Sequence, residues 1–197
     1  EDPRRQRQMC IRDSKKVIVT GGGGFIGAYL VKRLVKDGWE VEVIDTMVRG
    51  DATRLKPVID DIKIHNIDIR SEEKVLKAIK GSDLVIHLAA INGTENFYSK
   101  PDLVLDVGIR GALAVVNACF KSGINDLIIA SSAEVYQTPS IIPTPEDVAL
   151  TLPNSLNPRY SYGGSKIISE LIALNYHKQH FQKLQIFRPH NIYGPDM

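Results

Sequence analysis

The sequence predicts an α/β protein with a Rossmann-like, doubly wound parallel sheet. Strand-like and helix-like segments alternate along the chain, the strands are short apolar runs suited to burial on both faces, and a glycine-rich turn joins the first strand to the first helix. Because parallel strands need crossover helices, this alternation places helices on both faces of one sheet. We expect strands at residues 16–20, 40–45, 62–68, 84–88, 127–130 and 184–187.

The segments between these strands have the apolar spacing of helices. We expect helices over residues 25–36, 71–80, 103–121 and 160–180. Ser71 is expected to cap the second of them, and Gly123 to end the third in a left-handed conformation. Residues 139–158 are rich in proline and predict an irregular surface loop.

The composition is that of an ordinary globular protein. The 197-residue chain has a formal net charge of +2, too small to favour nucleic acid or a membrane surface, and 43% of its residues are hydrophobic. No apolar run approaches the ~20 residues of a membrane span, so we expect no membrane association. Cys10 and Cys119 form neither a disulfide framework nor a metal-ligand pattern. We therefore expect no metal and a reducing, cytoplasmic setting.

The two ends differ from the rest of the chain. Residues 1–14 are polar and unpatterned, and we expect a disordered or non-native tail before a folded domain of residues 15–197. Four arginines in this tail could form a nucleic-acid patch, but a solvated end is favoured because few apolar residues lie between them. The chain stops at Met197, directly after a Gly-Pro-Asp turn, and we interpret this as a truncation.

The glycine-rich turn has the spacing G-x-x-G-x-x-G at Gly21, Gly24 and Gly27. Glycine allows a positive φ and a close approach of backbone to a diphosphate, and the following helix, starting at Phe25 and Ile26, offers unpaired N–H groups to it. A flexible turn is the alternative. The position between strand and helix favours a nucleotide site.

Two carboxylates follow the next strands. Asp45 closes the second strand and could accept hydrogen bonds from an adenosine ribose, which favours NAD over NADP; nearby Arg49 argues the other way. A capping role is the alternative for Asp45. Asp68, with Ile69, ends the third predicted strand and could lie near the adenine, although a plain strand-end aspartate explains it nearly as well.

A candidate catalytic group follows the fifth strand. Tyr162 and Lys166 are four residues apart and therefore project from one helix face. A lysine ammonium favours the phenolate, so Tyr162 could take a hydroxyl proton while hydride leaves the adjoining carbon. Ser132 is favoured over Ser131 as a donor to the reacting oxygen, and Glu134 is a candidate second acid or base. Hydrogen bonding in a turn is the alternative for the serines, and a solvated loop carboxylate for Glu134.

These residues resemble those of the extended short-chain dehydrogenase/reductase family, which includes nucleotide-sugar epimerases, dehydratases and decarboxylases. The resemblance covers about residues 15–197. It rests on the glycine turn after Thr20, Asp45, His87-Leu88-Ala89-Ala90, Ser131-Ser132-Ala133-Glu134-Val135-Tyr136, the Tyr162/Lys166 pair, and Arg188-Pro189-His190-Asn191-Ile192-Tyr193-Gly194-Pro195.

The resemblance implies a bound NAD that is reduced and reoxidised within one turnover, with Ser132, Tyr162 and Lys166 as the catalytic triad. It implies that Leu88, Ala89 and Ala90 line the cofactor and that Asn191 contacts the nucleotide-sugar phosphate. It also implies a homodimer and a smaller C-terminal substrate domain, which this chain lacks.

The chain departs from the family pattern at two positions. Gly108 stands where the family usually has asparagine, three residues before Gly111, and Ala133 replaces the aspartate of the 4,6-dehydratases. Our leading hypothesis is therefore an NAD-dependent nucleotide-sugar epimerase acting through a keto-sugar intermediate. A decarboxylase or 4,6-dehydratase that uses Glu134 is the second hypothesis, and Asn157-Pro158-Arg159 resembles the decarboxylases. A non-catalytic NAD-binding regulator is the third.

Overall fold

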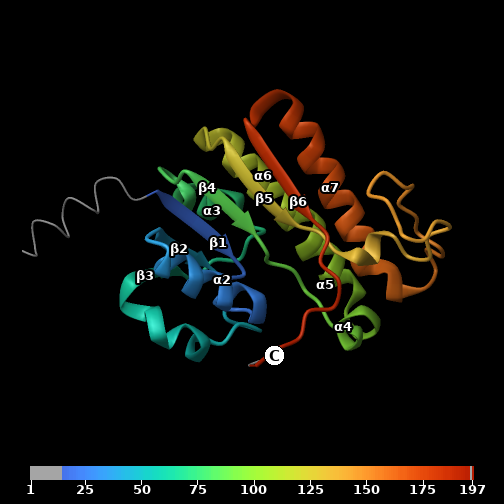
Figure 1. Ribbon diagram of the computed structural model, residues 1–197, viewed down its shortest axis with the longest axis horizontal. Helices are drawn as coiled ribbons and strands as arrows, with labels where there is room; N and C mark the ends of the chain where they lie inside the picture. The colour runs from blue at the N-terminus through green and yellow to red at the C-terminus, as the bar shows by residue number, and fades with distance from the viewer. Residues whose placement is uncertain (1–14, 196) are drawn as a thin grey trace, which may run out of the picture.

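A computed structural model describes residues 15–195 and 197. One parallel six-stranded sheet runs through the molecule in the order β3-β2-β1-β4-β5-β6 (Figure 1). The chain builds one half of the sheet outward from β1 and then crosses to build the other half, which confirms the predicted doubly wound fold. The strands are β1 (Lys16–Thr20), β2 (Glu40–Ile44), β3 (Ile62–His65), β4 (Leu84–His87), β5 (Asp126–Ala130) and β6 (Lys183–Phe187).

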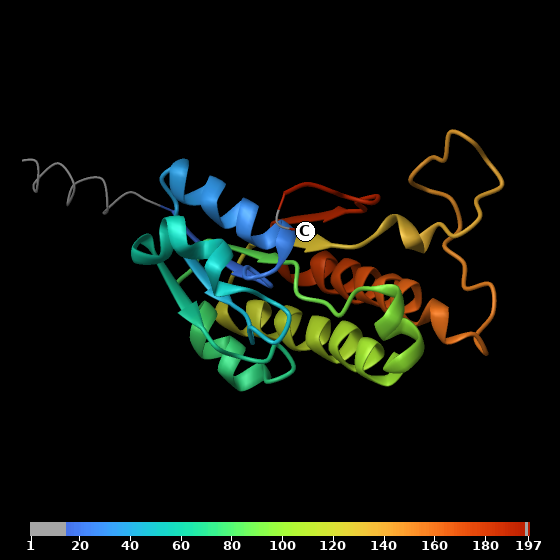
Figure 2. The same ribbon diagram turned by 90° about the horizontal axis from the view of Figure 1, so that it is seen from below.

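Helices cover both faces of the sheet (Figure 2). One face packs against α2 (Phe25–Lys36) and the short-turn helix η1 (Ala52–Asp61). The other packs against α3 (Glu72–Ile79), α6 (Gly111–Ser122) and α7 (Ser161–His180). Smaller helices near the ends of the strands are α4 (Thr94–Ser99), α5 (Pro101–Leu105), η2 (Asp106–Arg110), η3 (Ala133–Val135) and η4 (Pro158–Tyr160).

The two cores follow from the alternation of side chains along each strand. In β1, Val17 and Val19 face α2, whereas Ile18 faces the core beneath α3 and α6. All three are completely buried, so the continuous apolar run Val-Ile-Val is the sequence signature of a strand covered on both sides.

The predicted helix over residues 103–121 is interrupted in the structure. A π-turn, η2, separates α5 from α6, and Gly123 ends α6 with φ of +68°, as expected. The whole stretch Pro101–Ser122 is long and apolar enough to span a membrane by length and composition, so the expectation that no run reaches that length is wrong. Half of its most apolar window is buried within the protein.

Other boundaries differ where local turns take over. The predicted third strand ends early, because β3 stops at His65 and the backbone then turns, with Ile67 donating its N–H to the His65 carbonyl at 3.0 Å. Ser71 occupies the N-cap position of α3, but its side chain makes no cap hydrogen bond. The remaining predicted strands agree within one residue. Residues 139–157 contain no helix or strand, as predicted, whereas η1 and α4 were not predicted.

The expectations for residues 1–14, including Cys10, lie outside the described residues. Cys119 is completely buried in α6, and burial raises the pKa of its thiol to about 12. This agrees with its interpretation as a core residue. Among residues 15–195 and 197, no cluster of three His, Cys, Asp or Glu side chains is placed to hold a metal ion.

Candidate functional site

A large cleft opens at the carboxyl ends of the strands, where parallel α/β sheets bind ligands. Its volume is about 2010 Å³. The cleft brings together the glycine turn after β1, the segments after β2, β3 and β4, and the candidate catalytic residues of η3 and α7. All the predicted site residues line it: Gly21, Gly24, Phe25, Ile26, Gly27, Asp45, Asp68, Ile69, Leu88, Ala89, Ala90, Ser132, Glu134, Tyr162, Lys166 and Asn191.

The glycine turn leaves no room for side chains. Gly21 has φ of +74°, and a Cβ there would lie 2.8 Å from the backbone nitrogen of Ala89. A Cβ on Gly27 would lie 2.2 Å from the carbonyl oxygen of Gly21. Gly24 is the N-cap of α2, and no side chain caps that helix. The bare helix end and the tight backbone fit a diphosphate at this position.

Asp45 is held by the backbone at the end of β2. Its Oδ2 accepts the N–H of Gly23 at 2.9 Å, and its Oδ1 accepts that of Met47 at 2.8 Å. Each carboxylate oxygen can accept a further hydrogen bond, so the fixed carboxylate fits the hydroxyls of a ribose. The guanidinium of Arg49 donates to the carbonyl oxygen of Asn92, in the segment after β4, and not to Asp45.

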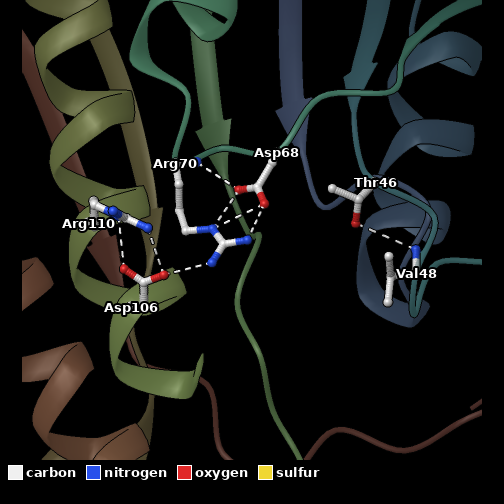
Figure 3. A network of polar contacts seen from close by, with 6 residues as sticks. All are labelled: Thr46, Val48, Asp68, Arg70, Asp106 and Arg110. Atoms are coloured by element: carbon white, nitrogen blue, oxygen red, sulfur yellow. Dashed lines mark hydrogen bonds and ion pairs between the residues drawn. The ribbon is translucent and has the colours of Figure 1, made fainter. Parts of the chain in front are cut away.

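Asp68 belongs to a four-residue ion network (Figure 3). Arg70 Nε donates to both oxygens of Asp68, at 3.0 and 3.1 Å, and Arg70 Nη1 donates to Asp106 at 2.6 Å. Arg110 pairs with Asp106 at 2.8 Å. The Arg70 hydrogen bonds lower the pKa of Asp68. The network ties the segment after β3 to the π-turn η2, which lies at the wall of the cleft. The adenine contact of Asp68 stays a prediction.

Figure 3 also shows the neighbouring turn after β2, where the Thr46 hydroxyl oxygen accepts the N–H of Val48 at 3.5 Å. This turn continues the segment that begins at Asp45, and Thr46 and Val48 both line the cleft. The turn and the ion network therefore stand on neighbouring segments of one cleft wall.

Tyr162 and Lys166 lie on one face of α7, as predicted from their spacing. Lys166 Nζ lies 5.6 Å from the centroid of the Tyr162 ring and donates to the carbonyl oxygen of Ala130 at 2.7 Å. Lys166 is 5% exposed, and burial lowers its pKa to about 8, while the charge of Glu170 opposes this shift. The lysine therefore binds the end of β5 directly beside the phenol.

Burial dominates the acidity of Tyr162. The pKa of Tyr162 is raised, first by burial and also by the charge of Glu134, whereas a hydrogen bond with Ser132 lowers it. From the sequence we expected Lys166, together with a positively charged nicotinamide, to lower this pKa, whereas the pKa in the chain by itself is raised. The reason is that the Tyr162 ring is only 8% exposed, so its anion loses hydration.

The structure separates the two serines. Ser131 donates its hydroxyl to Glu170 Oε1 on α7. Ser132 caps η3, accepting the N–H of Glu134 at 3.2 Å, and its hydroxyl lies close enough to Tyr162 to lower the pKa of the phenol. This arrangement supports the preference for Ser132 as the candidate donor to the reacting oxygen.

Glu134 is paired with Arg159, whose Nη2 lies 2.7 Å from Glu134 Oε1. This ion pair, together with its hydrogen bond, raises the pKa of Arg159. Glu134 lines the same cleft as Tyr162, and its side chain is 33% exposed, so it is partly solvated and ion-paired. Its carboxylate is held in place by the arginine.

The segment after β4 is anchored by His87. Its Nδ1 lies 2.8 Å from the Thr20 hydroxyl, which also accepts the N–H of Ala89 at 3.3 Å. Burial lowers the pKa of His87 to about 3, so the ring is neutral at pH 7. A neutral ring can either donate to the Thr20 hydroxyl from Nδ1 or accept from it there, according to its tautomer. This contact holds Leu88, Ala89 and Ala90 along the cleft.

The glycine that departs from the family pattern has a packing reason. A Cβ on Gly108 would lie 2.6 Å from Ser165 Oγ, so Ser165 fills the space of the missing side chain. The Gly108 carbonyl oxygen accepts the hydroxyl of Ser169 at 3.1 Å. An asparagine could not occupy this position without displacing α7.

Sequence reasoning missed two side chains behind the site. Phe97 of α4 is 3% exposed and stacks on Tyr162, with ring centroids 5.2 Å apart and an interplanar angle of 19°. Glu170 is 3% exposed and pairs with Arg188 after β6. The signal for Glu170 was its position one helical turn after Lys166. Phe97 had no comparable signal, because α4 itself was not predicted.

The chain is similar to proteins of nucleotide-sugar metabolism. The profile of the "NAD dependent epimerase/dehydratase family" matches residues 17–197. A UDP-N-acetyl-alpha-D-glucosaminuronate decarboxylase of Bacillus cytotoxicus is 32% identical over 92% of this chain and 56% of the relative. A putative UDP-glucose 4-epimerase of Methanocaldococcus jannaschii is 29% identical over 90% of this chain and 56% of the relative.

Solved structures agree with this similarity. A dTDP-glucose 4,6-dehydratase from Streptomyces venezuelae, solved with NAD bound, superposes with a TM-score of 0.83 and 27% identity, covering 91% of this chain and 57% of that one. The chain thus spans about half the length of the relatives it matches, 43–56% of the first three.

Proposed function

Because the chain belongs to the NAD dependent epimerase/dehydratase family of extended short-chain dehydrogenases/reductases, we propose that the whole protein is an NAD-dependent nucleotide-sugar epimerase. The epimerase would act through a transient keto sugar. One observation carries this proposal: Ser132, Tyr162 and Lys166 meet at the cleft that also contains the glycine turn and Asp45.

The residues of the cleft fit NAD. The amides at the start of α2 would bind its diphosphate, and Asp45 would accept from the adenosine ribose. Lys166 would hold the hydroxyls of the nicotinamide ribose, and Leu88, Ala89 and Ala90 would line the cofactor. When bound, NAD supplies reversible two-electron oxidation of the sugar carbon.

The chain's own groups would handle the proton. Tyr162 Oη takes the proton of the sugar hydroxyl and returns it after the keto sugar has turned its other face to the site. Ser132 donates to the same oxygen and limits the charge that develops on it. The Lys166 ammonium beside the ring stabilises the phenolate, offsetting the burial that raises the pKa of Tyr162. Asn191, exposed after β6, would contact the nucleotide phosphate.

A decarboxylase is the second candidate, and the placement of Glu134 favours it. The carboxylate lies at the cleft beside Tyr162, paired with Arg159, and could act on the same keto intermediate as an acid or base. Two relatives described as UDP-glucuronic acid and UDP-N-acetyl-glucosaminuronate decarboxylases match the chain at 30% and 32% identity. A 4,6-dehydratase is less well supported, because Ala133 cannot supply a proton to leaving water.

A non-catalytic NAD-binding regulator would be expected to lose part of the catalytic group. The three side chains are instead brought together here, which argues for an enzyme. We further propose a cytoplasmic homodimer. Its support is the set of apolar side chains that α6 and α7 expose: Leu113, Phe120, Ile168, Leu171 and Leu174. Light scattering of the full-length protein would test the dimer.

The deciding experiment replaces Tyr162 by Phe in the full-length protein, with the exposed Tyr98→Phe as the matched control. Both proteins are incubated with UDP-, GDP-, CDP- and dTDP-sugars, and products are identified by mass and NMR. We expect Tyr162→Phe to lose turnover and keep NAD binding, and Tyr98→Phe to keep both. An unchanged mass indicates epimerisation, loss of carbon dioxide indicates decarboxylation, and loss of water indicates dehydration. Turnover by the Tyr162→Phe protein would refute all three.

A further inference from the structure

The Phe97 side chain packs between two other side chains of the site, Tyr162 and Arg159. Its ring stacks on Tyr162 at 5.2 Å, and the guanidinium carbon of Arg159 lies 5.1 Å from its centroid. Phe97, Tyr162 and Val104 form a small apolar cluster of their own, apart from the two main cores. One side of the Tyr162 ring is therefore covered by the Phe97 ring of α4, which also contacts the Arg159 guanidinium.

The same arginine holds the candidate acid or base. Arg159 Nη2 pairs with Glu134 Oε1 at 2.7 Å, and the Glu134 N–H donates to Ser132 Oγ at 3.2 Å. Ser132 in turn lowers the pKa of Tyr162, so its hydroxyl lies beside the phenol. The contacts therefore close a circuit from Tyr162 through Phe97, Arg159 and Glu134 to Ser132 and back to Tyr162.

Arg159 has few alternatives to this arrangement. Its Nη1 is buried and has no hydrogen-bond partner among the described residues. A buried N–H without a partner is costly, so the other contacts of the Arg159 side chain must hold it in place. Here those are the Glu134 carboxylate and the face of Phe97, an ion pair and a cation–π contact.

We infer that Arg159 and Phe97 are positioning residues for the reaction proposed above: Arg159 fixes the Glu134 carboxylate, and Phe97 fixes the Tyr162 ring against Ser132. Only the catalytic purpose of this positioning rests on the proposed function, because the positioning itself can be measured without turnover. It assigns a role to α4, an element absent from the sequence-based expectations.

The charges of Glu134 and Arg159 should have opposite effects on the pKa of Tyr162. Glu134 raises the pKa of Tyr162 because a nearby negative charge disfavours the phenolate. Arg159 neutralises that charge. Removing Arg159 should therefore raise the pKa of Tyr162 further, and removing the charge of Glu134 should lower it.

Other charged or titratable groups near the phenol must stay constant in the comparison. Lys166 faces the ring from α7, Ser132 and Glu134 face it from the η3 segment, and Arg159 comes from η4. Tyr98 on α4 and Tyr160 on η4 act on Arg159. None of Lys166, Tyr98 and Tyr160 is altered in the variants below.

The test is a titration of the tyrosine ring carbons by NMR. The 197-residue chain is labelled with ¹³Cζ-tyrosine, and the resonance of Tyr162 among its 7 tyrosines is assigned by its disappearance in Tyr162→Phe. We compare the wild type with Glu134→Gln, Arg159→Met and the double variant. Arg33→Met, on the exposed face of α2, is the matched control for loss of an arginine.

We expect the midpoint of Tyr162 to fall in Glu134→Gln, to rise in Arg159→Met, to fall in the double variant as in Glu134→Gln, and to stay unchanged in Arg33→Met. An Arg159→Met midpoint equal to wild type would overturn the inference. So would a double variant that keeps the rise. If Arg159→Met fails to fold by circular dichroism, Arg159→Lys, expected near wild type, and Glu134→Gln decide the question, and an unchanged Glu134→Gln midpoint refutes it.

The role of Phe97 is tested with two variants that differ in the shape of the side chain. Phe97→Tyr keeps the stacked ring, whereas Phe97→Leu keeps apolar volume without it. We expect Phe97→Leu, and not Phe97→Tyr, to lower kcat of the full-length protein at least tenfold with little change in KM. Equal kcat in the two variants would contradict the positioning role. Loss of the proposed function would appear separately, as turnover that survives Tyr162→Phe.

Discussion

Arg188 and Glu170 form a two-point ion pair behind the candidate catalytic residues. Arg188 Nε donates to Glu170 Oε1 at 2.9 Å, and Arg188 Nη2 donates to Oε2 at 2.7 Å. Glu170 Oε1 also accepts the hydroxyl of Ser131. The pair therefore ties α7 to the ends of β5 and β6, the three elements that deliver the site.

Breaking this pair should cost much stability. Arg188→Met leaves a carboxylate that is 3% exposed without its cation, so we expect a loss of about 3–5 kcal/mol in the free energy of unfolding. The matched control is Arg33→Met in the exposed Arg33–Asp37 pair, expected to lose at most about 0.5 kcal/mol. Urea titrations followed by circular dichroism measure both. Equal losses in the two variants would contradict the assignment.

The glycine turn predicts a second effect. Gly27→Ala places a Cβ where the Gly21 carbonyl oxygen stands, at 2.2 Å, so the backbone must move. We expect a loss of about 1–3 kcal/mol in stability and a large loss of NAD affinity. Gly38→Ala is the control: it has φ of +86° but nothing within 4 Å of the added carbon. It should lose stability through strain alone and bind NAD normally by calorimetry.

Asp45 should decide the preference for the cofactor. Asp45→Ala removes a carboxylate that the backbone amides of Gly23 and Met47 orient toward the cleft. Hydrogen bonds to a charged group contribute about 1.5–3 kcal/mol, so NAD should bind at least about tenfold more weakly. Binding of NADP should change less, because the same carboxylate would repel its 2′-phosphate. Fluorescence titration measures both, with Asp37→Ala as a distant control, and an unchanged ratio of the two affinities would count against the ribose role.

Lys166 should make the protein less stable at neutral pH. Its pKa is about 8 in the folded chain against 10.5 as a free side chain, so between these values the unfolded state binds more protons. Stability from this group therefore rises with pH through that window. Lys166→Met removes the dependence, and we expect it to gain about 1–3 kcal/mol at pH 7 and progressively less toward pH 9.5.

Urea titrations at pH 7, 8.5 and 9.5 test the lysine prediction, with the exposed Lys77→Met as control. Lys77→Met should differ from the wild type equally at each pH. A gain for Lys166→Met that does not shrink as the pH rises would show that its charge is not the cause.

Most of the fold was predictable because its signals are local. The Val17-Ile18-Val19 run is buried on both faces, and such an apolar run predicts a central parallel strand from the sequence alone. The turn at Gly21 and the i, i+4 spacing of Tyr162 and Lys166 are local as well. The position of the cleft then follows from the sheet, because the carboxyl ends of all its parallel strands lie at the same edge.

The remainder depends on contacts between distant segments. The pairing of Arg70 with Asp106 joins residues 36 apart, and the stacking of Phe97 on Tyr162 joins the helices α4 and α7. Neither has a pattern of its own in the sequence. The pKa of Tyr162 was misjudged for the same reason, since burial by Phe97 and its neighbours cannot be read from a lysine four residues away.

The π-turn η2 lets one helical stretch pack in two directions. An α-helix advances about 100° per residue, so the added residue of a π-turn rotates everything after it relative to everything before it. Val104, before the turn, packs with Phe97 and Tyr162, while Val115, after it, packs in the main core. The turn therefore sets the angle between two packing faces of one continuous helical stretch, so that the face before it meets the Tyr162 ring while the face after it meets the core beneath the sheet.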